Sequence, residues 1–292
     1  MSKNPELINI NADGVLVSEI TETKTPEQYF TQYSNSKDFL SRYKAVENAA
    51  ENASKDEVSL KTLVAALKDE NFRIRMKALS GFDLSKPDQQ KISISEVEKL
   101  ANNDPKTLVQ SAAISALAQT KDKKYLPLFE KGMNAVSNSV KGSSISGISA
   151  IDPSKAAALI DKIDLDGASE DLISALLPSI VKNKIEKQMP TIASMAAFYP
   201  FIKFQKPELG EVAEEGFNWI MTSDNLKATE NLTKVLTQVK GQIGENPQAK
   251  MMISQILKDG LAKKMLVLKA NPSSKTIHQQ IDLLNKTIEA YK

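Results

Sequence analysis

The chain has 292 residues, of which 38 are basic and 36 acidic, and it contains no cysteine. A net charge of +2 produces no field that favours a polyanionic partner, and the lack of cysteine excludes disulfides and thiol catalysis. Only Arg42, Arg73 and Arg75 are arginine, the residue that usually makes bidentate contacts with phosphates and guanines. We therefore expect no nucleic-acid partner. We expect no membrane partner either, because no apolar run approaches the roughly 18–20 residues that span a bilayer.

The first 24 residues differ from the rest of the chain. Two short runs rich in β-branched residues, 7–10 and 15–17, flank Asn11-Ala-Asp-Gly14, where the glycine can supply a positive φ. This pattern predicts a β-hairpin or two short strands. Because a lone hairpin is marginal in water, we interpret residues 1–24 as the β-strand remnant of a preceding β-sandwich domain.

From Thr25 to the end, the pattern predicts helices joined by short turns. The sequence 25–28, Thr-Pro-Glu-Gln, is a helix start, because Thr caps, Pro fits the first turn and Gln completes a capping box. Further breaks between helices are marked by an Asn or Asp next to a proline, at 104–105, 152–153, 246–247 and 271–272. We expect residues 25–292 to form one helical domain.

Three segments of the helical region repeat one another. Residues 74–82, 109–117 and 140–148 align at offsets of 35 and 31 residues, with apolar and small residues at matching positions. A fourth copy is expected at 172–180, where Pro178 would bend the helix. We expect the small positions to let adjacent helices approach closely and the apolar positions to fill a shared core.

Two of the copies follow an acidic turn residue, Asp69 or Asp104, five positions before their first apolar residue. The pattern Asp-x-x-x-x-apolar-Arg-x-x-Ala resembles the HEAT repeat, although Gln110 and Lys141 replace the Arg in two copies. The predicted fold is all-α: a HEAT-like α-solenoid, in which helix pairs stack into a right-handed superhelix.

Few residues of the sequence are candidates for a catalytic or metal-binding role. The single histidine, His278, lies one position off the apolar stripe of its predicted helix, so we expect it at the edge of that stripe or on the surface. With one His and no Cys, the usual ligand sets of a zinc site are missing. The segment Gly142-Ser-Ser-Ile-Ser-Gly147 falls on the small positions of the repeat and predicts helix packing, not a nucleophile loop. We expect no catalytic, cofactor-binding or metal-binding residues in this chain.

Three other clusters are interpreted as structural. The acidic pairs Asp69-Glu70 and Glu214-Glu215 predict solvated faces or helix starts. The methionines Met251-Met252 and Met265 fall in apolar helical stretches and predict buried core. The aromatic-rich region 198–219 predicts either a junction between helices or a docking surface for another domain.

The segment Tyr29–Ala45, together with the short β start, resembles a junction in zinc aminopeptidases of the aminopeptidase N family, where a β-sandwich domain is followed by a C-terminal helical domain. In that family Gln-Tyr and then Asp/Ser-Arg-x-x-Ala open the first long helix. The corresponding residues here are Gln32-Tyr33 and Ser41-Arg42-Tyr-Lys-Ala45. The ending, Leu283–Tyr291, is similar to the family's terminal helix.

The resemblance implies the non-catalytic C-terminal domain of a bacterial metallopeptidase, which shapes and gates substrate access to an upstream catalytic domain. Its partners would be the catalytic and β-sandwich domains of the same protein, with peptide substrates met indirectly, and the zinc would lie in the catalytic domain. The alternative is a stand-alone HEAT-repeat scaffold that binds protein along its concave face. A third, distant hypothesis, a HEAT-like nucleic-acid enzyme, is disfavoured by the even spread of lysine. The composition fits a soluble protein of the cytoplasm or the periplasm.

Overall fold

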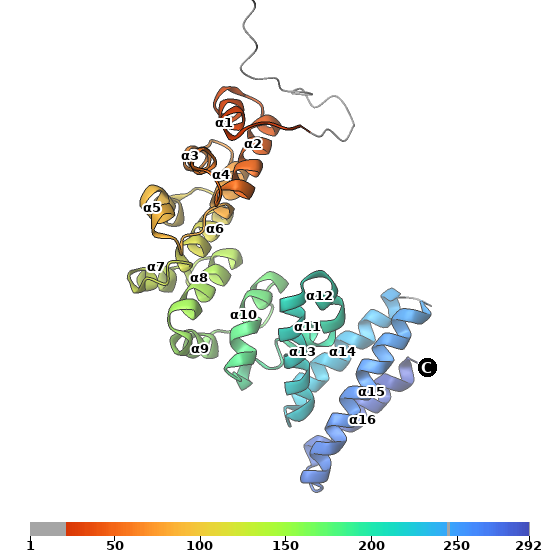
Figure 1. The fold of residues 1–292 in the computed structure, drawn as a ribbon. Coiled ribbons are helices and arrows are strands. Elements are labelled where there is room, and N and C mark those ends of the chain that lie inside the picture. Colours follow the sequence, from red (N-terminus) through yellow and green to blue (C-terminus); the bar gives the residue numbers. More distant parts are fainter. Residues whose placement is uncertain (1–21, 244–245, 292) are drawn as a thin grey trace, which may run out of the picture. The chain divides into compact units, whose positions relative to one another are not determined.

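The computed structural model describes residues 22–243 and 246–291 of the chain (Figure 1). These residues form helices joined by turns, and no strand occurs among them, so the described chain is all-α as predicted. The hairpin predicted within residues 1–24 gains no support, because residues 7–17 lie outside the described ranges. The chain divides into two compact units, Met1–Asp152 and Pro153–Lys292, which are described separately below.

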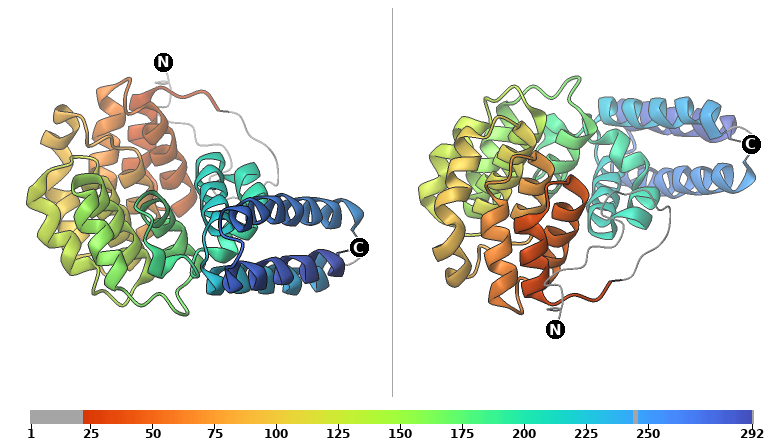
Figure 2. Two further views of the ribbon diagram at one scale, coloured as in Figure 1. Left: turned by 90° about the horizontal axis from the view of Figure 1, so that it is seen from below. Right: turned by 90° about the horizontal axis from the view of Figure 1, so that it is seen from above.

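Unit 1 consists of consecutive helix pairs. Within each pair the two helices pack against each other, and the second helices, α2, α4, α6 and α8, also pack one after another (Figures 1 and 2). The helices are α1 (Pro26–Asn35), α2 (Phe39–Asn52), α3 (Glu57–Ala66), α4 (Phe72–Ser80), α5 (Pro87–Asn103), α6 (Thr107–Ala118), α7 (Leu126–Gly132) and α8 (Asn138–Ile151), with a short 3₁₀ turn η1 (Lys123–Tyr125) before α7.

The sequence repeat maps onto the second helices of these pairs, and its apolar positions form the core of unit 1. All nine are at most 3% exposed: Ile74, Leu79, Phe82, Val109, Ile114, Leu117, Val140, Ile145 and Ile148. Stacking of equivalent helices therefore buries a continuous apolar seam, as the repeat predicted.

The small positions of the repeat allow close helix contacts. A Cβ placed on Gly81 would lie 2.6 Å from Leu63 Cδ1, and one placed on Gly147 would lie 2.7 Å from a ring carbon of Phe129. Side chains at these positions would push neighbouring helices apart. The predicted role of Gly142–Gly147 in packing is confirmed, because this segment lies inside α8.

The predicted helix starts are correct in part. Thr25 caps α1 with a complete capping box: Thr25 Oγ1 accepts from the Gln28 amide at 3.3 Å, and Gln28 Oε1 accepts from the Thr25 amide at 2.9 Å. α6 begins later than the Asp104-Pro105 signal suggests, at Thr107. The reason is that Asp104 Oδ1 accepts the Lys106 amide at 2.8 Å in a turn that precedes the helix.

Unit 2 begins with helices of at most 13 residues and ends with four helices of 16 to 24 residues. It comprises α9 (Pro153–Lys162), α10 (Glu170–Lys182), η2 (Glu186–Gln188), α11 (Ala193–Ala197), α12 (Tyr199–Gln205), α13 (Pro207–Thr222), α14 (Leu226–Ile243), α15 (Pro247–Ala270) and α16 (Lys275–Ala290). α16 packs against both α14 and α15, and these three run alongside one another (Figure 2). The proposed fourth copy of the repeat lies in α10, which continues through Pro178.

A buried lysine joins two helices of unit 2. Lys264 on α15 is 0% exposed, and its ammonium donates to the carbonyls of Ile220, at 3.1 Å, and Ser223. These carbonyls belong to the C-terminal end of α13, where backbone acceptors lack partners within the helix and a cation is favoured. Burial lowers the pKa of Lys264 to about 8, and the charge of Asp224 opposes this shift.

The C-terminal end of α16 is held against α14 by the Tyr291 hydroxyl, which donates to the Leu236 carbonyl.

None of the helices within the described ranges is both long enough and apolar enough to cross a membrane.

Candidate functional site

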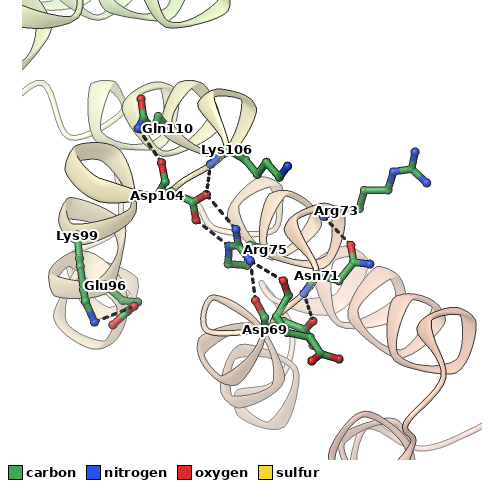
Figure 3. Close-up of polar contacts among 10 residues, drawn as sticks. Asp69, Asn71, Arg73, Arg75, Glu96, Lys99, Asp104, Lys106 and Gln110 are labelled. Carbon is green, nitrogen blue, oxygen red and sulfur yellow. Dashed lines mark hydrogen bonds and ion pairs between the residues drawn. The ribbon is translucent and has the colours of Figure 1, made fainter.

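The acidic turn residues and arginines of the repeat form a chain of polar contacts through unit 1, which we call the Asp–Arg ladder (Figure 3). Arg75 Nε and Nη2 donate to the carboxylate of Asp104 in the next helix pair, at 2.7 and 2.9 Å. Arg75 Nη1 donates to the carbonyls of Asp69 and Glu70 in its own pair, at 2.7 and 3.1 Å. One guanidinium thus joins the turns of two successive repeats.

The ladder extends in both directions from Arg75. Before it, Arg42 Nη1 and the Tyr33 hydroxyl each donate to Asp69 Oδ2 at 3.1 Å. After it, the side-chain amide of Gln110 donates to the Asp104 carbonyl at 2.7 Å, the same bond that Arg75 makes to Asp69 (Figure 3). The replacement of Arg by Gln in this copy therefore keeps the contact within the repeat.

The ladder is structural rather than a ligand site. Asp69 and Asp104 are 6% and 5% exposed, and each carboxylate is occupied by a guanidinium. A hollow of about 400 Å³ lies beside them, but its charged rim is paired: Glu96 lies 3.9 Å from the Lys68 ammonium and 3.6 Å from that of Lys99. Of the two roles predicted for Asp69, a solvated face is wrong, because Arg42 covers its carboxylate. A place at a helix start fits, because Asp69 accepts the amide of Asn71, the N-cap of α4.

A large hollow lies in unit 2 and has two adjoining parts. One part, of about 710 Å³, lies between the loop that precedes α10 and the outer face of α14. The other, of about 500 Å³, lies between α10, α11 and α12. The two parts share Glu170, Ser194, Met195 and Val235, so they form one surface groove. We call it the α10–α14 groove.

One side of this groove is acidic. Asp164, Asp166, Glu170 and Asp171 line it from the loop and the first turn of α10, and all four side chains are exposed. Within the described residues none of the four has an ion-pair partner; Asp164 only accepts the Asp166 amide, at 3.0 Å. We call these four residues the acidic wall. Carboxylates in the first turn also stabilise α10, which explains their place there.

Four lysines also line the groove, Lys187, Lys206, Lys227 and Lys234, and two of them have contacts within the chain. Lys187 donates to the Asp161 carbonyl at 2.8 Å, and Lys227 lies 3.7 Å from the Glu230 carboxylate. Lys234 on α14 faces the groove without an ion pair among the described residues. The acidic wall is therefore the side with more unpaired charge.

The part of the groove next to α12 has a cluster of apolar side chains, although Glu170, Asp171 and Lys206 line it as well. Met195, Phe198, Ile202, Leu209 and Val235 line it, and all but Met195 are partly exposed. α12 has no buried residue, although its sequence is Tyr-Pro-Phe-Ile-Lys-Phe-Gln. Apolar surface that a helix leaves open in this way favours contact with another molecule.

Two buried or half-buried amide side chains hold the groove in shape. Gln188, 3% exposed, donates to the carbonyls of Ile160 and Ile163 at 3.0 and 2.9 Å and so fixes the loop that carries the acidic wall. Asn231 on α14 donates to the Pro190 carbonyl at 3.0 Å. Both walls are thus tied to the same turn by satisfied hydrogen bonds, which preorganises the groove.

The aromatic-rich region divides between the two roles that its sequence allows. Phe217 is 2% exposed and its ring centroid lies 5.5 Å from that of Tyr199, as expected for a junction between helices. Phe201 and Phe204 are 38% and 91% exposed on α12, as expected for a docking surface. The junction is confirmed for Phe217, and the docking surface stays a prediction for the exposed Phe201 and Phe204.

Two further predictions have opposite outcomes. His278 is exposed, with Nε2 3.1 Å from the Pro272 carbonyl, as predicted. Met251 and Met265 are 70% and 43% exposed, so the prediction that they are buried is wrong. Met252, the third of these methionines, is half-buried. No group of three or more His, Asp or Glu side chains that would hold a metal ion occurs in the described ranges.

No protein-family model matches the chain, and no curated protein matches it in sequence. Among solved structures, the chain is similar to the complex of CpcE and CpcF of phycocyanin lyase from Nostoc sp. PCC7120. The identity is 18%, the match covers 94% of this chain and 98% of that one, and the TM-score is 0.44. A likeness at this level carries no conclusion about function.

The resemblance to the aminopeptidase N family is therefore corrected. No family model supports it, and the solved structure reported above is of a phycocyanin lyase complex, not of an aminopeptidase domain. The structure gives the physical reason: Ser41-Arg42-Tyr-Lys-Ala45 lies in α2, where Arg42 contacts Asp69 as Arg75 contacts Asp104. The segment is one more step of the ladder. The function and the partner domains that the resemblance implied are therefore wrong as well.

Proposed function

We propose that this chain is a non-catalytic, HEAT-like scaffold that binds a segment of a partner protein in the α10–α14 groove. The observation that carries the proposal is the groove itself, which combines an apolar cluster, an unpaired acidic wall and a fixed frame. Grooves between helices that join an apolar anchor site to a few placed polar groups are common protein-binding and ligand-binding sites.

The HEAT-like, right-handed solenoid is part of the same proposal. The Asp–Arg ladder supports it, because it links helix pairs of one repeat type at equivalent positions. These contacts lie in unit 1, so they support the solenoid part of the proposal, whereas the groove in unit 2 is held by the hydrogen bonds of Gln188 and Asn231. We also propose that the chain works without a metal or another cofactor, which metal analysis of the purified protein would test.

Selection of peptides from a random display library against the purified chain tests the groove. Binders are then measured against Ser194→Trp, which fills the centre of the groove, because Ser194 lines both of its parts. Ser254→Trp is the matched control: this serine is also half-buried in unit 2, on α15, and lines neither part. We expect selected peptides to lose at least tenfold in affinity with the first variant and less than twofold with the second. Equal affinity for both variants would contradict the proposal.

A further inference from the structure

We infer that the segment bound in the α10–α14 groove is basic and carries a bulky apolar anchor residue. The inference rests on the proposed function and adds the chemistry of the partner. It follows from two features of the groove: the carboxylates of residues 164–171, which line both of its parts, and the apolar side chains of the part next to α12.

The charge preference comes from the acidic wall. Asp164, Asp166, Glu170 and Asp171 lie within eight consecutive residues, and none is neutralised by a cation of the described chain. Groups of like charge that line a concave surface focus the field and attract a ligand of opposite sign. Lysine or arginine side chains of a partner would pair with these carboxylates, whereas an acidic segment would be repelled.

The lysines of the groove do not cancel this preference. Lys227 lies 3.7 Å from the Glu230 carboxylate, and Lys187 donates to the Asp161 carbonyl at 2.8 Å but keeps its charge. With Lys206 and Lys234, three cations of the lining have no ion pair among the described residues, against four carboxylates. The position of Lys234 across the groove from the acidic wall gives the bound segment an orientation. Basic residues of the bound segment would face the α9–α10 loop, and an acidic residue of the segment would pair with Lys234 on α14.

The anchor preference comes from the apolar side chains next to α12. Phe198, Ile202 and Leu209 are partly exposed there and come from three successive elements, so they form a concave surface and not a single ridge. A large side chain such as Leu, Phe or Trp would bury apolar area on all three. Small residues would leave that area in contact with water.

The test combines peptide composition with a charge reversal. Peptides enriched on the wild-type chain are sequenced, and individual peptides are then measured by fluorescence anisotropy against the double variant Asp166→Lys/Glu170→Lys. The matched control is Glu208→Lys/Glu215→Lys, which also reverses two exposed carboxylates in unit 2, one of them in the first turn of a helix, but outside the groove. Circular dichroism verifies that both variants are folded.

We expect the enriched peptides to carry a net positive charge and at least one bulky apolar residue. They should bind the groove variant at least tenfold more weakly and the control variant within twofold. Affinity for the wild type should fall as salt rises from 50 to 500 mM, because the contacts are exposed ion pairs. A selection on the groove variant should reverse the preference and enrich acidic peptides.

Two outcomes would overturn the inference, and they separate it from the proposed function. Neutral or acidic peptides that still lose affinity on Ser194→Trp would leave the groove as the binding site and refute its preference for basic segments. Basic peptides that bind all variants equally would refute both, since their binding would then be general attraction to an acidic surface.

Discussion

Arg75 and Asp104 join neighbouring helix pairs of unit 1 through two hydrogen bonds, from Nε at 2.7 Å and from Nη2 at 2.9 Å. They are 8% and 5% exposed, so the ion pair is largely shielded from water. The same guanidinium satisfies two backbone carbonyls of its own turn. This relationship explains why an arginine that stands 29 residues before an aspartate matters for the stacking of the repeats.

Removal of one partner of this pair should destabilise unit 1 strongly. We expect Arg75→Ala to lower the free energy of unfolding by about 3–5 kcal/mol, because the buried Asp104 carboxylate loses its counter-ion. Denaturant unfolding followed by circular dichroism measures this. Arg73→Ala is the matched control, since Arg73 is exposed on the same helix, and should change stability by less than about 0.5 kcal/mol.

The two residues should also be coupled. The double variant Arg75→Gln/Asp104→Asn should lose less stability than the sum of its single variants, by about 1 kcal/mol or more. It removes both charges, and a glutamine at this position can keep the bond to the preceding carbonyl, as Gln110 does. Strict additivity would show that the ladder is not a coupled unit.

The close packing at Gly147, a small position of the repeat, leads to a further prediction. Gly147→Ala should destabilise the protein by about 1–3 kcal/mol, because the new Cβ would lie 2.7 Å from the Phe129 ring. Gly241→Ala, at a helical site with no atom within 4 Å, should instead stabilise it by about 0.5–1 kcal/mol. Thermal unfolding of both variants provides the comparison. Stabilisation in both cases would mean that α7 and α8 do not approach as closely as described.

The buried lysine of unit 2 predicts a pH dependence. The pKa of Lys264 is lowered from 10.5 to about 8, so the unfolded state binds more protons than the folded state between these two values. The free energy of unfolding of the wild type should therefore rise with pH above 8, by at most about 1.4 kcal/mol per pH unit from this group. Below pH 8 Lys264 is charged in both states, and its burial lowers the free energy of unfolding by the full amount.

Comparison with Lys264→Met isolates this effect. Between pH 8 and 9.5, the free energy of unfolding of the wild type should rise relative to that of the variant. That range lies below the titration of Tyr199 and Tyr291, whose pKa values burial raises above 10. A difference that is constant across this range would indicate that Lys264 titrates at its ordinary value in the folded protein.

The frame of the groove gives a further prediction. Gln188→Ala should cost about 1–3 kcal/mol, because the carbonyls of Ile160 and Ile163 would lose their buried donor. Amide hydrogen exchange of residues 163–168 should become faster in this variant, and peptide affinity should fall without any change in a residue of the acidic wall. Unchanged exchange in this loop would argue against Gln188 as its anchor.

Sequence reasoning predicted much of the fold because helices and repeats leave local signals. The apolar positions at 74–82, 109–117 and 140–148 identified the core, and the acidic turns identified the ladder residues Asp69 and Asp104. Arg42 was missed as a ladder residue, because its partner lies 27 residues further along the chain. Its segment was instead assigned to an unrelated family.

The groove was not predicted, for a physical reason. Its lining comes from residues 163–238, and no local pattern indicates which exposed faces of α10, α12 and α14 will meet around a hollow. Met251 was misplaced for a similar reason: helical spacing identifies an apolar face but not whether another helix covers it. The acidic residues 164–171 carried a usable signal, since four carboxylates in eight residues interrupt a lysine-rich chain.

The most direct test of the account is site-specific photocrosslinking from inside the groove. A benzophenone amino acid placed at Ser194 should capture one partner segment from extracts of the source organism, whereas the same probe at Ser254 should not. A synthetic peptide of the captured segment should bind the wild-type chain and lose at least tenfold in affinity for Ser194→Trp. Identical crosslinks from both positions, or a captured segment that binds Ser194→Trp as well as it binds the wild type, would contradict the claim that this chain works by holding a partner in the α10–α14 groove.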